Sequence, residues 1–341
     1  MKEKNDLQEL FVEVTNRCLL SCVHCSSCAG PNIGQSIPLE KVVSMIDQTI
    51  PLGLRSFTVS GGEPFLYPDL FRLLTYAKER GLILGLYTCG VIGTSRSLES
   101  LNDEFINKLF ELKIDKLIFS LQGGNSQIHD SVTGIAGSFN ITVQSIIKSV
   151  KCGLPVELHF VPMKINYQEI ESIVKLAHQL GVKKVSLLRL VPQGRCDENL
   201  TLSSLEGIRV FDDAKTIRQL YPEVYLRFGA PFDCLTFAGV GCSASKSKLL
   251  ISALGEAFPC EAFKFLRGTR PSIHKSTIKY IWETDKLLND LRILKKENLK
   301  HCNSCNLLSK CEGGCPGQRM LVNGDIKNGP DPWCLVHSII V

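Results

Sequence analysis

The segment "LFVEVTNRCLLSCVHCSSC", residues 10–28, joins an apolar run to four of the chain's 15 cysteines. Its first six residues are rich in β-branched and aromatic side chains, which is typical of a buried strand. The thiols begin at Cys18, soon after that run ends. The sequence therefore predicts a strand whose following loop gathers reactive sulfur.

The same rhythm continues along the first two thirds of the chain. Apolar runs that predict strands recur about 30 residues apart, the size of a βα unit, and they cover residues 10–15, 56–60, 82–88, 116–121, 156–161 and 185–191. Apolar positions recur every three or four residues between them, which predicts helices at residues 39–50, 69–80, 102–113 and 167–180. Gly53, Gly81 and Gly181 stand where helices are expected to end. Six strands alternating with helices predict a parallel sheet with right-handed crossovers, open or partly closed as a barrel. Functional residues are then expected on the loops after the strands.

Length and composition set the broad class. A chain of 341 residues can form one large domain and a smaller one, and 44% hydrophobic with 21% charged residues is typical of a globular enzyme. The polar amino terminus lacks the apolar segment of a secretory signal, and no apolar run approaches the ~20 residues of a membrane helix. We therefore expect a cytoplasmic protein without a membrane segment. In a reducing compartment, 15 cysteines favour metal ligation over disulfides.

Positive charge is concentrated in the last third of the chain. Residues 231–341 hold 15 Lys and Arg against 10 Asp and Glu, whereas residues 1–230 hold 24 of each, so the last third carries the whole net charge of +5. The stretch "ILKKENLK" is typical of a solvated surface, and an acidic partner or substrate is the alternative explanation. We recognise no arginine-rich run or nucleic-acid-binding module, so no nucleic acid partner is expected.

The first cysteine loop has the spacing Cys18-x3-Cys22-x2-Cys25. Three thiolates so placed can bind three irons of a [4Fe–4S] cluster and leave the fourth iron open. A zinc site would need a closed set of four ligands, and Cys28 could supply the fourth. The spacing favours iron–sulfur over zinc.

The loop after the second predicted strand reads "SGGEP", and contains Gly61, Gly62, Glu63 and Pro64. Two glycines allow the backbone to approach a ligand closely, and the glutamate adds an acceptor for an ammonium group. Alone, this motif is also compatible with a tight turn. A CxxxCxxC loop followed by GGEP after the next strand is a specific combination.

These paired motifs resemble those of the radical S-adenosylmethionine (SAM) superfamily, over about residues 8–200. The resemblance implies that the SAM amino and carboxylate groups chelate the open iron and that GGEP holds the amino group. One electron from the cluster then cleaves SAM to a 5′-deoxyadenosyl radical, which abstracts a substrate hydrogen. It also implies a partial (β/α)6 barrel and SAM contacts at Ser120, Asn166 and Arg189. Cys89, in "YTCG", replaces an asparagine common in the family.

Seven cysteines in the last third form a second constellation, at Cys242, Cys260, Cys302, Cys305, Cys311, Cys315 and Cys334. Their spacing resembles the SPASM extension of radical SAM maturases, which binds two auxiliary [4Fe–4S] clusters. The resemblance implies an outer cluster fully ligated by Cys302, Cys305, Cys311 and Cys334. It implies an inner cluster held by Cys242, Cys260 and Cys315. The inner cluster is either completed by Cys234 or left with an open iron, and Cys234 is the favoured ligand.

The remaining thiols lie outside both motifs. Cys152 fits a small buried core residue. Cys28, Cys89 and Cys196 follow predicted strands on the expected active-site face, where radical SAM epimerases use a thiol to return a hydrogen atom. We therefore predict these three as candidate hydrogen donors, against the alternative of ordinary loop residues.

The predicted organisation is a radical SAM core at residues 1–230 and a SPASM domain at residues 231–341. Resemblance to the maturases implies modification of a peptide by crosslinking, epimerisation or another change at Cα or Cβ. A SPASM oxidoreductase acting on a sugar, alcohol or tetrapyrrole is the alternative, and a non-catalytic iron–sulfur electron carrier or sensor is a third. The expected partner is a reductant of the flavodoxin or ferredoxin type. Since residues 7–15 already form the predicted first strand, a peptide substrate would need a separate leader-peptide-binding protein or direct docking near the basic carboxyl-terminal domain.

Overall fold

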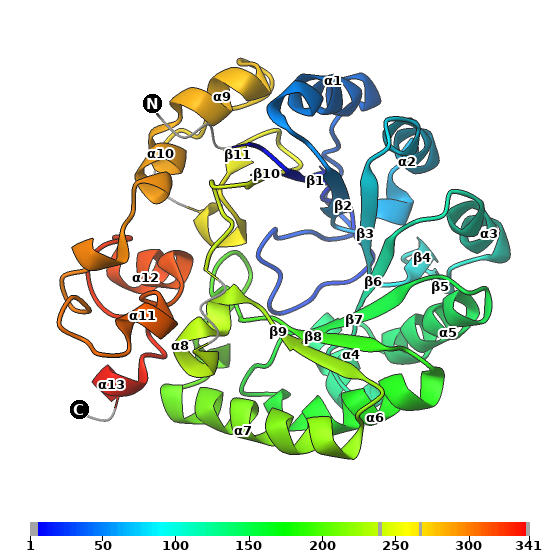
Figure 1. The fold of residues 1–341 in the computed structure, drawn as a ribbon. Helices are drawn as coiled ribbons and strands as arrows, with labels where there is room; N and C mark the ends of the chain where they lie inside the picture. The colour runs from blue at the N-terminus through cyan, green and yellow to red at the C-terminus, as the bar shows by residue number, and fades with distance from the viewer. Residues whose placement is uncertain (1–5, 238–240, 266–267, 339–341) are drawn as a thin grey trace.

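The chain folds around one nine-stranded sheet that curves into a partial barrel (Figure 1). The computed structural model describes residues 6–237, 241–265 and 268–338. The strand order is β11-β10-β1-β2-β3-β6-β7-β8-β9, and each pair from β10 to β9 is parallel. The predicted α/β class with a partial (β/α)6 barrel is confirmed.

The sheet strands are β1 (Glu9–Thr15), β2 (Ser56–Gly61), β3 (Ile83–Thr88), β6 (Lys116–Ser120), β7 (Val156–Phe160), β8 (Lys184–Leu187), β9 (Tyr225–Phe228), β10 (Lys248–Ile251) and β11 (Ala257–Phe258). A separate hairpin is formed by β4 (Val91–Thr94) and β5 (Ser97–Ser100). The helices are α1 (Leu39–Thr49), α2 (Leu70–Glu79), α3 (Asp103–Glu111), α4 (Ser126–Thr133), α5 (Ser138–Lys151), α6 (Ile170–Leu180), α7 (Ser204–Leu220), α8 (Asp233–Thr236), α9 (Ile278–Thr284), α10 (Lys286–Arg292), α11 (Leu308–Cys311), α12 (Pro316–Asn323) and α13 (Leu335–Ser338).

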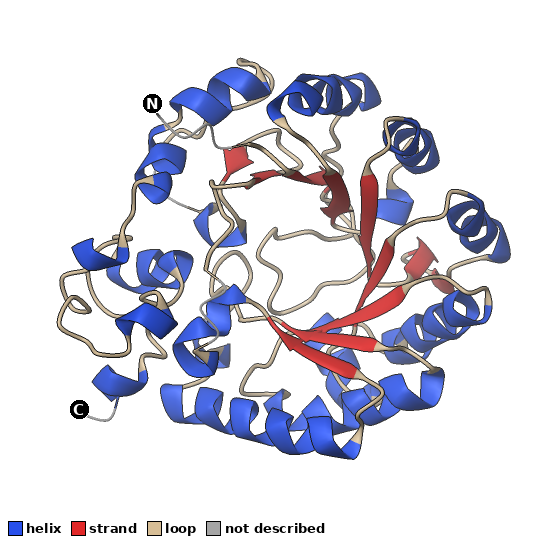
Figure 2. Cartoon of the chain, in the orientation of Figure 1, coloured by secondary structure: helices blue, strands red, loops and turns tan. Residues whose placement is uncertain are grey.

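The helices lie on the outside of the curved sheet (Figure 2). Successive strand side chains point to opposite faces, and one set packs against the helices. On β1, for example, Leu10, Val12 and Val14 belong to the main hydrophobic core, whereas Phe11 and Glu13 alternate with them. The other set therefore faces the barrel interior, which we call the lumen.

The predicted helix stops are confirmed by the backbone. Gly53 and Gly181 follow helical segments in the left-handed conformation, with φ of 101° and 78°. Residues with a side chain rarely adopt this conformation, so glycine ends these helices at low cost.

The carboxyl-terminal third is not separate from the barrel sheet. Strand β10 pairs in parallel with β1, and β11 pairs with β10 in an antiparallel manner. The sheet thus continues across the predicted boundary near residue 230, while α9 to α13 lie to one side of the barrel (Figure 1). Within the described ranges, no helix is long and apolar enough to cross a membrane.

Candidate active site

The loop after β1 brings the three predicted cluster thiols together. Cys18, Cys22 and Cys25 all belong to one hydrophobic cluster, which also contains Cys89. Burial raises the pKa of the Cys22 thiol, and the neighbouring Cys18 and Cys25 raise it further. Closely spaced thiols of this kind are suited to a cationic iron core, which would stabilise their thiolates.

The GGEP loop lies directly against the start of this cysteine loop. The Gly62 N–H donates to the Thr15 carbonyl at 2.6 Å, and the Glu63 N–H donates to the Arg17 carbonyl at 2.8 Å. A Cβ added at Gly61 would lie 2.2 Å from the Thr15 oxygen, and one added at Gly62 would lie 2.2 Å from the Arg17 oxygen. The two glycines are therefore required by the close approach of the two loops.

Glu63 is fully buried, and its carboxylate has partners within the chain. It accepts hydrogen bonds from the Thr88 hydroxyl at 2.9 Å, and from the Cys89 N–H at 2.7 Å and the Cys89 thiol at 2.8 Å. Burial raises the pKa of this carboxyl, and the hydrogen bonds from Cys89 lower it in opposition. The carboxylate thus joins the GGEP loop to the end of β3, and its predicted contact with the SAM amino group stays a prediction.

Arg195, which the sequence analysis did not identify, is hydrogen-bonded to the backbone of the cysteine loop. Its guanidinium donates to the carbonyls of Cys22 at 2.8 Å and Ala29 at 2.7 Å, and its N–H donates to the Cys25 carbonyl at 3.1 Å. Three hydrogen bonds from one residue fix the backbone that carries the thiols. A lone arginine after a strand has no spacing signal, so only the folded structure reveals it.

The other predicted SAM contacts lie near the carboxyl ends of the strands. Ser120 is the last residue of β6 and is half-buried. Asn166 is buried: its Oδ1 accepts from the Met163 N–H at 2.7 Å and its Nδ2 donates to the Gln122 carbonyl at 3.0 Å. Asn166 therefore ties together the loops after β6 and β7, and direct contact with SAM stays a prediction for both residues.

Arg189 occupies the boundary with the carboxyl-terminal third. Its guanidinium forms two hydrogen bonds with the Asp331 carboxylate, at 2.9 and 2.7 Å, and both side chains are almost fully buried. Asp331 also accepts from the Cys315 N–H at 2.8 Å, so the pair connects the β8 loop to a predicted auxiliary-cluster ligand. The predicted role of Arg189 near SAM has no support in these contacts and stays a prediction.

The carboxyl-terminal cysteines fall into two groups. Cys242 and Cys315 line one cavity. Burial is the main cause that raises the pKa of the Cys260 thiol, and the neighbouring Cys315 and Cys242 raise that pKa further. A second cavity is lined by Cys302, Cys305, Cys311 and Cys334. The resemblance to SPASM proteins implies the same inner and outer sets, and their role as cluster ligands stays a prediction.

Cys234 has neighbours in both groups, because both Cys311 and Cys315 raise the pKa of its thiol. It lines the same cavity as the four outer cysteines and is buried. Its Sγ is 3.8 Å from Asp331 Oδ1 and 3.9 Å from Arg189 Nη1. The favoured assignment of Cys234 to the inner cluster stays a prediction.

The remaining thiols differ in their relation to the cluster loop. A hydrogen bond with Cys89 lowers the pKa of Cys18, so these two thiols are neighbours. Cys196 packs in a different hydrophobic cluster, with its Sγ 3.5 Å from the Asp197 carbonyl. Cys28 is half-buried with φ of 52°, and Cys152 follows α5. Of the three predicted hydrogen donors, Cys89 is the one that shares a hydrophobic cluster with the ligand thiols.

The sequence analysis also did not identify a group of hydrogen-bonded polar side chains in the lumen. The buried His159 on β7 is bonded through Nε2 to Glu157 Oε1 at 2.9 Å, and Glu157 also accepts from Lys184 at 2.9 Å and Ser186 at 2.5 Å. Burial alone would raise the Glu157 pKa, but these donors lower it to about 2. Each of these residues alternates with core residues, so the strand pattern alone gave no reason to group them.

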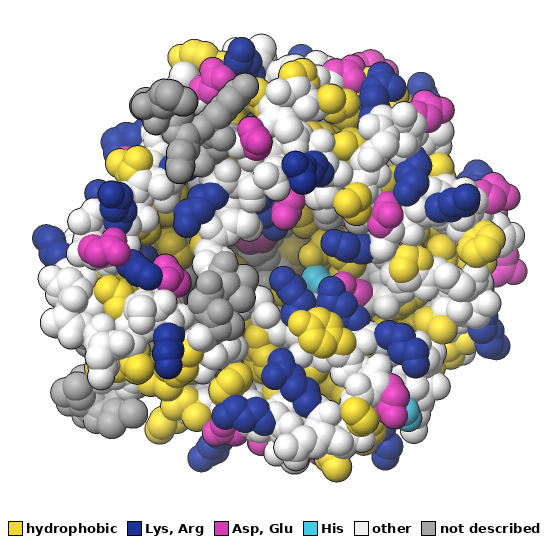
Figure 3. All heavy atoms as spheres, in the orientation of Figure 1, with side chains coloured by type: hydrophobic (Ala, Val, Ile, Leu, Met, Phe, Trp, Pro, Cys, Tyr) yellow, Lys and Arg dark blue, Asp and Glu magenta, His cyan; other side chains and the backbone are white. Residues whose placement is uncertain are grey.

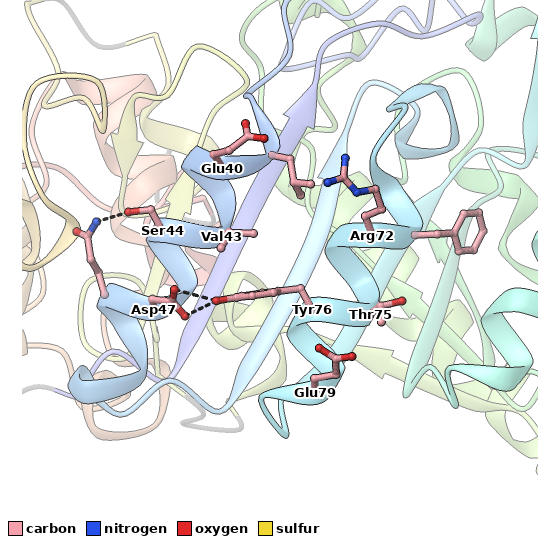
Figure 4. A pocket seen from close by; sticks show the side chains of 11 residues that line it. Glu40, Val43, Ser44, Asp47, Arg72, Thr75, Tyr76 and Glu79 are labelled. Atoms are coloured by element: carbon pink, nitrogen blue, oxygen red, sulfur yellow. Dashed lines mark hydrogen bonds between the residues drawn. The ribbon is translucent and has the colours of Figure 1, made fainter.

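A surface pocket of about 930 Å³ lies elsewhere, between α1 and α2 (Figure 4). Its lining includes Asp47, which accepts hydrogen bonds from the Tyr76 hydroxyl at 2.7 and 2.8 Å. Figure 4 shows the two helices contributing side chains from opposite sides of the groove. None of the predicted site residues lines this pocket.

Comparison with known proteins agrees with the fold and the motif-bearing loops. A model of the radical SAM superfamily matches residues 12–197. The AdoMet-dependent heme synthase of Methanosarcina barkeri is 26% identical over 345 residues, which cover 95% of this chain and 95% of the relative. The mycofactocin maturase MftC of Mycolicibacterium smegmatis is 25% identical over 347 residues, which cover 95% of this chain and 81% of the relative. Streptococcus suis SuiB bound to S-adenosylmethionine superimposes with a TM-score of 0.78 at 20% identity, over 97% of this chain and 78% of SuiB.

Because the superfamily match spans more than half of the sequence, the chain belongs to the radical SAM superfamily. It is accordingly a radical SAM enzyme, which binds SAM and a [4Fe–4S] cluster. The resemblance inferred from CxxxCxxC and GGEP is confirmed.

Proposed function

We propose that this enzyme modifies a peptide and carries three [4Fe–4S] clusters, one for SAM and two auxiliary. The single observation that carries the cluster count is the separation of eleven cysteines into three groups. One group lies on the β1 loop, and two lie in the carboxyl-terminal third. When bound, the first cluster supplies the electron that cleaves SAM to a 5′-deoxyadenosyl radical.

The residues of the chain divide the work around that first cluster. Cys18, Cys22 and Cys25 would hold three irons, since cysteine thiolates are the usual ligands of such clusters. Arg195 fixes the backbone of Cys22 and Cys25. The Gly61–Pro64 segment would hold the SAM amino group from the adjoining loop, which Glu63 anchors to the end of β3.

Two comparisons support a peptide substrate. The relative from Mycolicibacterium smegmatis is called a maturase, and SuiB is also known with its precursor peptide SuiA bound, in a structure that covers 97% of this chain at a TM-score of 0.77. A peptide can be extended into a barrel lumen, where the polar side chains of β7 and β8 offer partners for its backbone groups.

A small-molecule substrate, of the tetrapyrrole kind, is the second candidate. It is supported by the heme synthase relative, because the match covers 95% of both chains. We expect the enzyme to receive its electrons from a flavodoxin or ferredoxin. A separate leader-binding protein remains part of the peptide proposal, and we expect the enzyme to be cytoplasmic.

The test of the peptide proposal is turnover of the short peptides encoded beside the gene, with SAM and a reductant under anaerobic conditions. A crosslink removes two hydrogens from the peptide, and epimerisation in heavy water adds deuterium at Cα, so mass spectrometry distinguishes both from no reaction. Modification of a peptide supports the proposal. Modification of a tetrapyrrole, with every peptide unchanged, would refute it in favour of the second candidate.

Iron content in matched variants tests the cluster count. We expect about twelve irons per chain in the wild type, from three four-iron clusters. Cys22→Ala should lose about four irons together with SAM cleavage, and Cys305→Ala should lose about four with the SAM cluster retained. Cys152→Ala, at a thiol outside all three groups, is the control that should keep the full iron content. Loss of all iron in each variant, or of none, would contradict three independent sites.

A further inference from the structure

Basic side chains line the lumen of the barrel, three of them at the amino ends of strands and Arg227 further along β9. Lys116 begins β6, Lys184 begins β8, Lys248 begins β10, and Arg227 lies on β9. The residues next to them, which include Leu117, Val185, Leu226 and Leu249, belong to the core under the helices. Alternation along a strand therefore directs the four basic side chains toward the lumen. Figure 3 shows a hollow near the centre of the molecular face, with Lys and Arg side chains and some Asp and Glu side chains around it.

Carboxylates in this part of the lumen do not fully balance the cations. Glu9 is paired in register with Lys248, and Glu157 binds Lys184 at 2.9 Å. Within the described residues, Lys116 and Arg227 make no ion pair with any carboxylate. Glu13 on β1 and Glu261 share Lys264, and Glu261 acts on Tyr87 together with Glu9 and Glu157. Five basic groups against these four carboxylates leave an excess of one positive charge, and low-dielectric walls strengthen such a field.

Deeper in the lumen, one buried polar atom lacks a partner. His159 is 5% exposed, and its Nδ1 makes no hydrogen bond, while its Nε2 is held by Glu157. The imidazole lies edge-on to the Tyr87 ring, with 5.0 Å between ring centres, and Tyr87 is likewise 5.3 Å from Phe11. Buried polar atoms without partners are rare in folded proteins and point to a missing ligand or water.

The nearby charges explain the ionisation of this histidine. Burial lowers the His159 pKa most, the Glu157 carboxylate raises it, and Arg227 and Lys184 lower it. A bound anion would compensate Arg227 and Lys184, so the imidazole could then take up a proton.

We propose that the part of the lumen bordered by Arg227, Lys248 and His159 is a binding site for a carboxylate-bearing segment of the peptide substrate. Arg227 and Lys248 are its principal cations. Lys248 lies with its Nζ 5.0 Å from the centre of the Phe11 ring, and so borders the same aromatic surface as Tyr87 and His159. Guanidinium and carboxylate form charge-assisted hydrogen bonds, which are the strong ones. This inference deepens the proposed function and rests on it, because the substrate is taken to be a peptide.

The test is binding of labelled peptides to the reconstituted, SAM-loaded enzyme, measured by fluorescence anisotropy without turnover. The probes are a fluorescein-labelled tetraglutamate and the same peptide with glutamine throughout. We expect the wild type to bind the acidic peptide at least about fivefold more tightly than the glutamine peptide, which is the effect expected for a charge-assisted hydrogen bond. Arg227→Gln and Lys248→Gln should each remove most of that preference. Arg227→Lys, which keeps the charge, should retain part of it.

The control is Lys279→Gln, at an exposed lysine on α9, which should bind both peptides as the wild type does. Equal binding of the two peptides by the wild type would overturn the inference. So would an equal loss in Lys279→Gln and Arg227→Gln, because the effect would then belong to overall charge. If citrate binds in an Arg227-dependent manner and tetraglutamate does not, the site serves a small acid and the peptide assignment is wrong. Absence of iron or of SAM cleavage in the wild type would instead refute the proposed function, since peptide binding is measured separately.

Discussion

Replacing Gly62 by alanine should separate the GGEP loop from the cysteine loop. The added Cβ would lie 2.2 Å from the Arg17 carbonyl oxygen and 2.6 Å from its carbonyl carbon, both of which are backbone atoms. Backbone atoms cannot rotate away, so the loops must move apart. That movement stretches the bonds from Gly62 to Thr15, at 2.6 Å, and from Glu63 to Arg17, at 2.8 Å.

The expected cost follows from these contacts. Two backbone hydrogen bonds contribute about 1 kcal/mol each, and overpacking a tight contact costs about 1–3 kcal/mol, so the free energy of unfolding should fall by about 3–5 kcal/mol. The catalytic effect should be larger, because misplacing a binding group by about 1 Å can cost about a hundredfold in rate. We would measure urea unfolding and the rate of 5′-deoxyadenosine formation.

Gly34→Ala is the matched control, since an added Cβ there meets nothing within 4 Å. This variant should unfold and react as the wild type does. If Gly62→Ala were equally normal in both assays, the close approach of the two loops would not be the reason for its glycine.

Three further predictions concern other contacts. Glu157→Gln should destabilise the protein at neutral pH by about 3 kcal/mol, because the Glu157 pKa is about 2 in the folded protein and 4.5 in the unfolded chain. The difference in unfolding free energy between wild type and variant, measured by urea unfolding, should have its full size above pH 4.5 and disappear as the pH falls toward 2. Arg189→Met leaves Asp331 buried without its counter-ion, which should lower stability in thermal unfolding by about 3–5 kcal/mol. Lys215→Met, at an exposed ion pair, is the control and should lower stability by under about 1 kcal/mol. Equal losses of stability in the two variants would refute the importance of burial for the Arg189–Asp331 pair. Arg195→Met should speed the release of cluster iron to a chelator, and an unchanged rate would show that its bonds to the cysteine loop are dispensable.

Much of the fold followed from periodicity. The six predicted strands correspond to β1, β2, β3, β6, β7 and β8, because each is an apolar run of usable length between helical patterns. The last run was predicted to extend to residue 191, but β8 ends at Leu187. Strands β9, β10 and β11 were missed: they have four, four and two residues, and their pairing depends on partners far along the chain.

The site shows the same division between local and distant information. The cysteine motif and the GGEP motif were recognisable because the chemistry of each depends on fixed spacing within its own loop. Arg195 and Asp331 form hydrogen bonds with residues more than a hundred positions away, so no local pattern marks them. The lumen cations likewise become a group only when strands far apart in sequence are brought side by side.

The most direct test of the central claim is SAM cleavage by the anaerobically reconstituted protein and its Cys22→Ala variant. We expect 5′-deoxyadenosine from the reduced wild type and none from Cys22→Ala, although the variant should still hold the iron of the two carboxyl-terminal groups. Formation of 5′-deoxyadenosine by Cys22→Ala, or its absence from a wild type that holds all its iron, would contradict the assignment of the β1 loop as the radical-generating site.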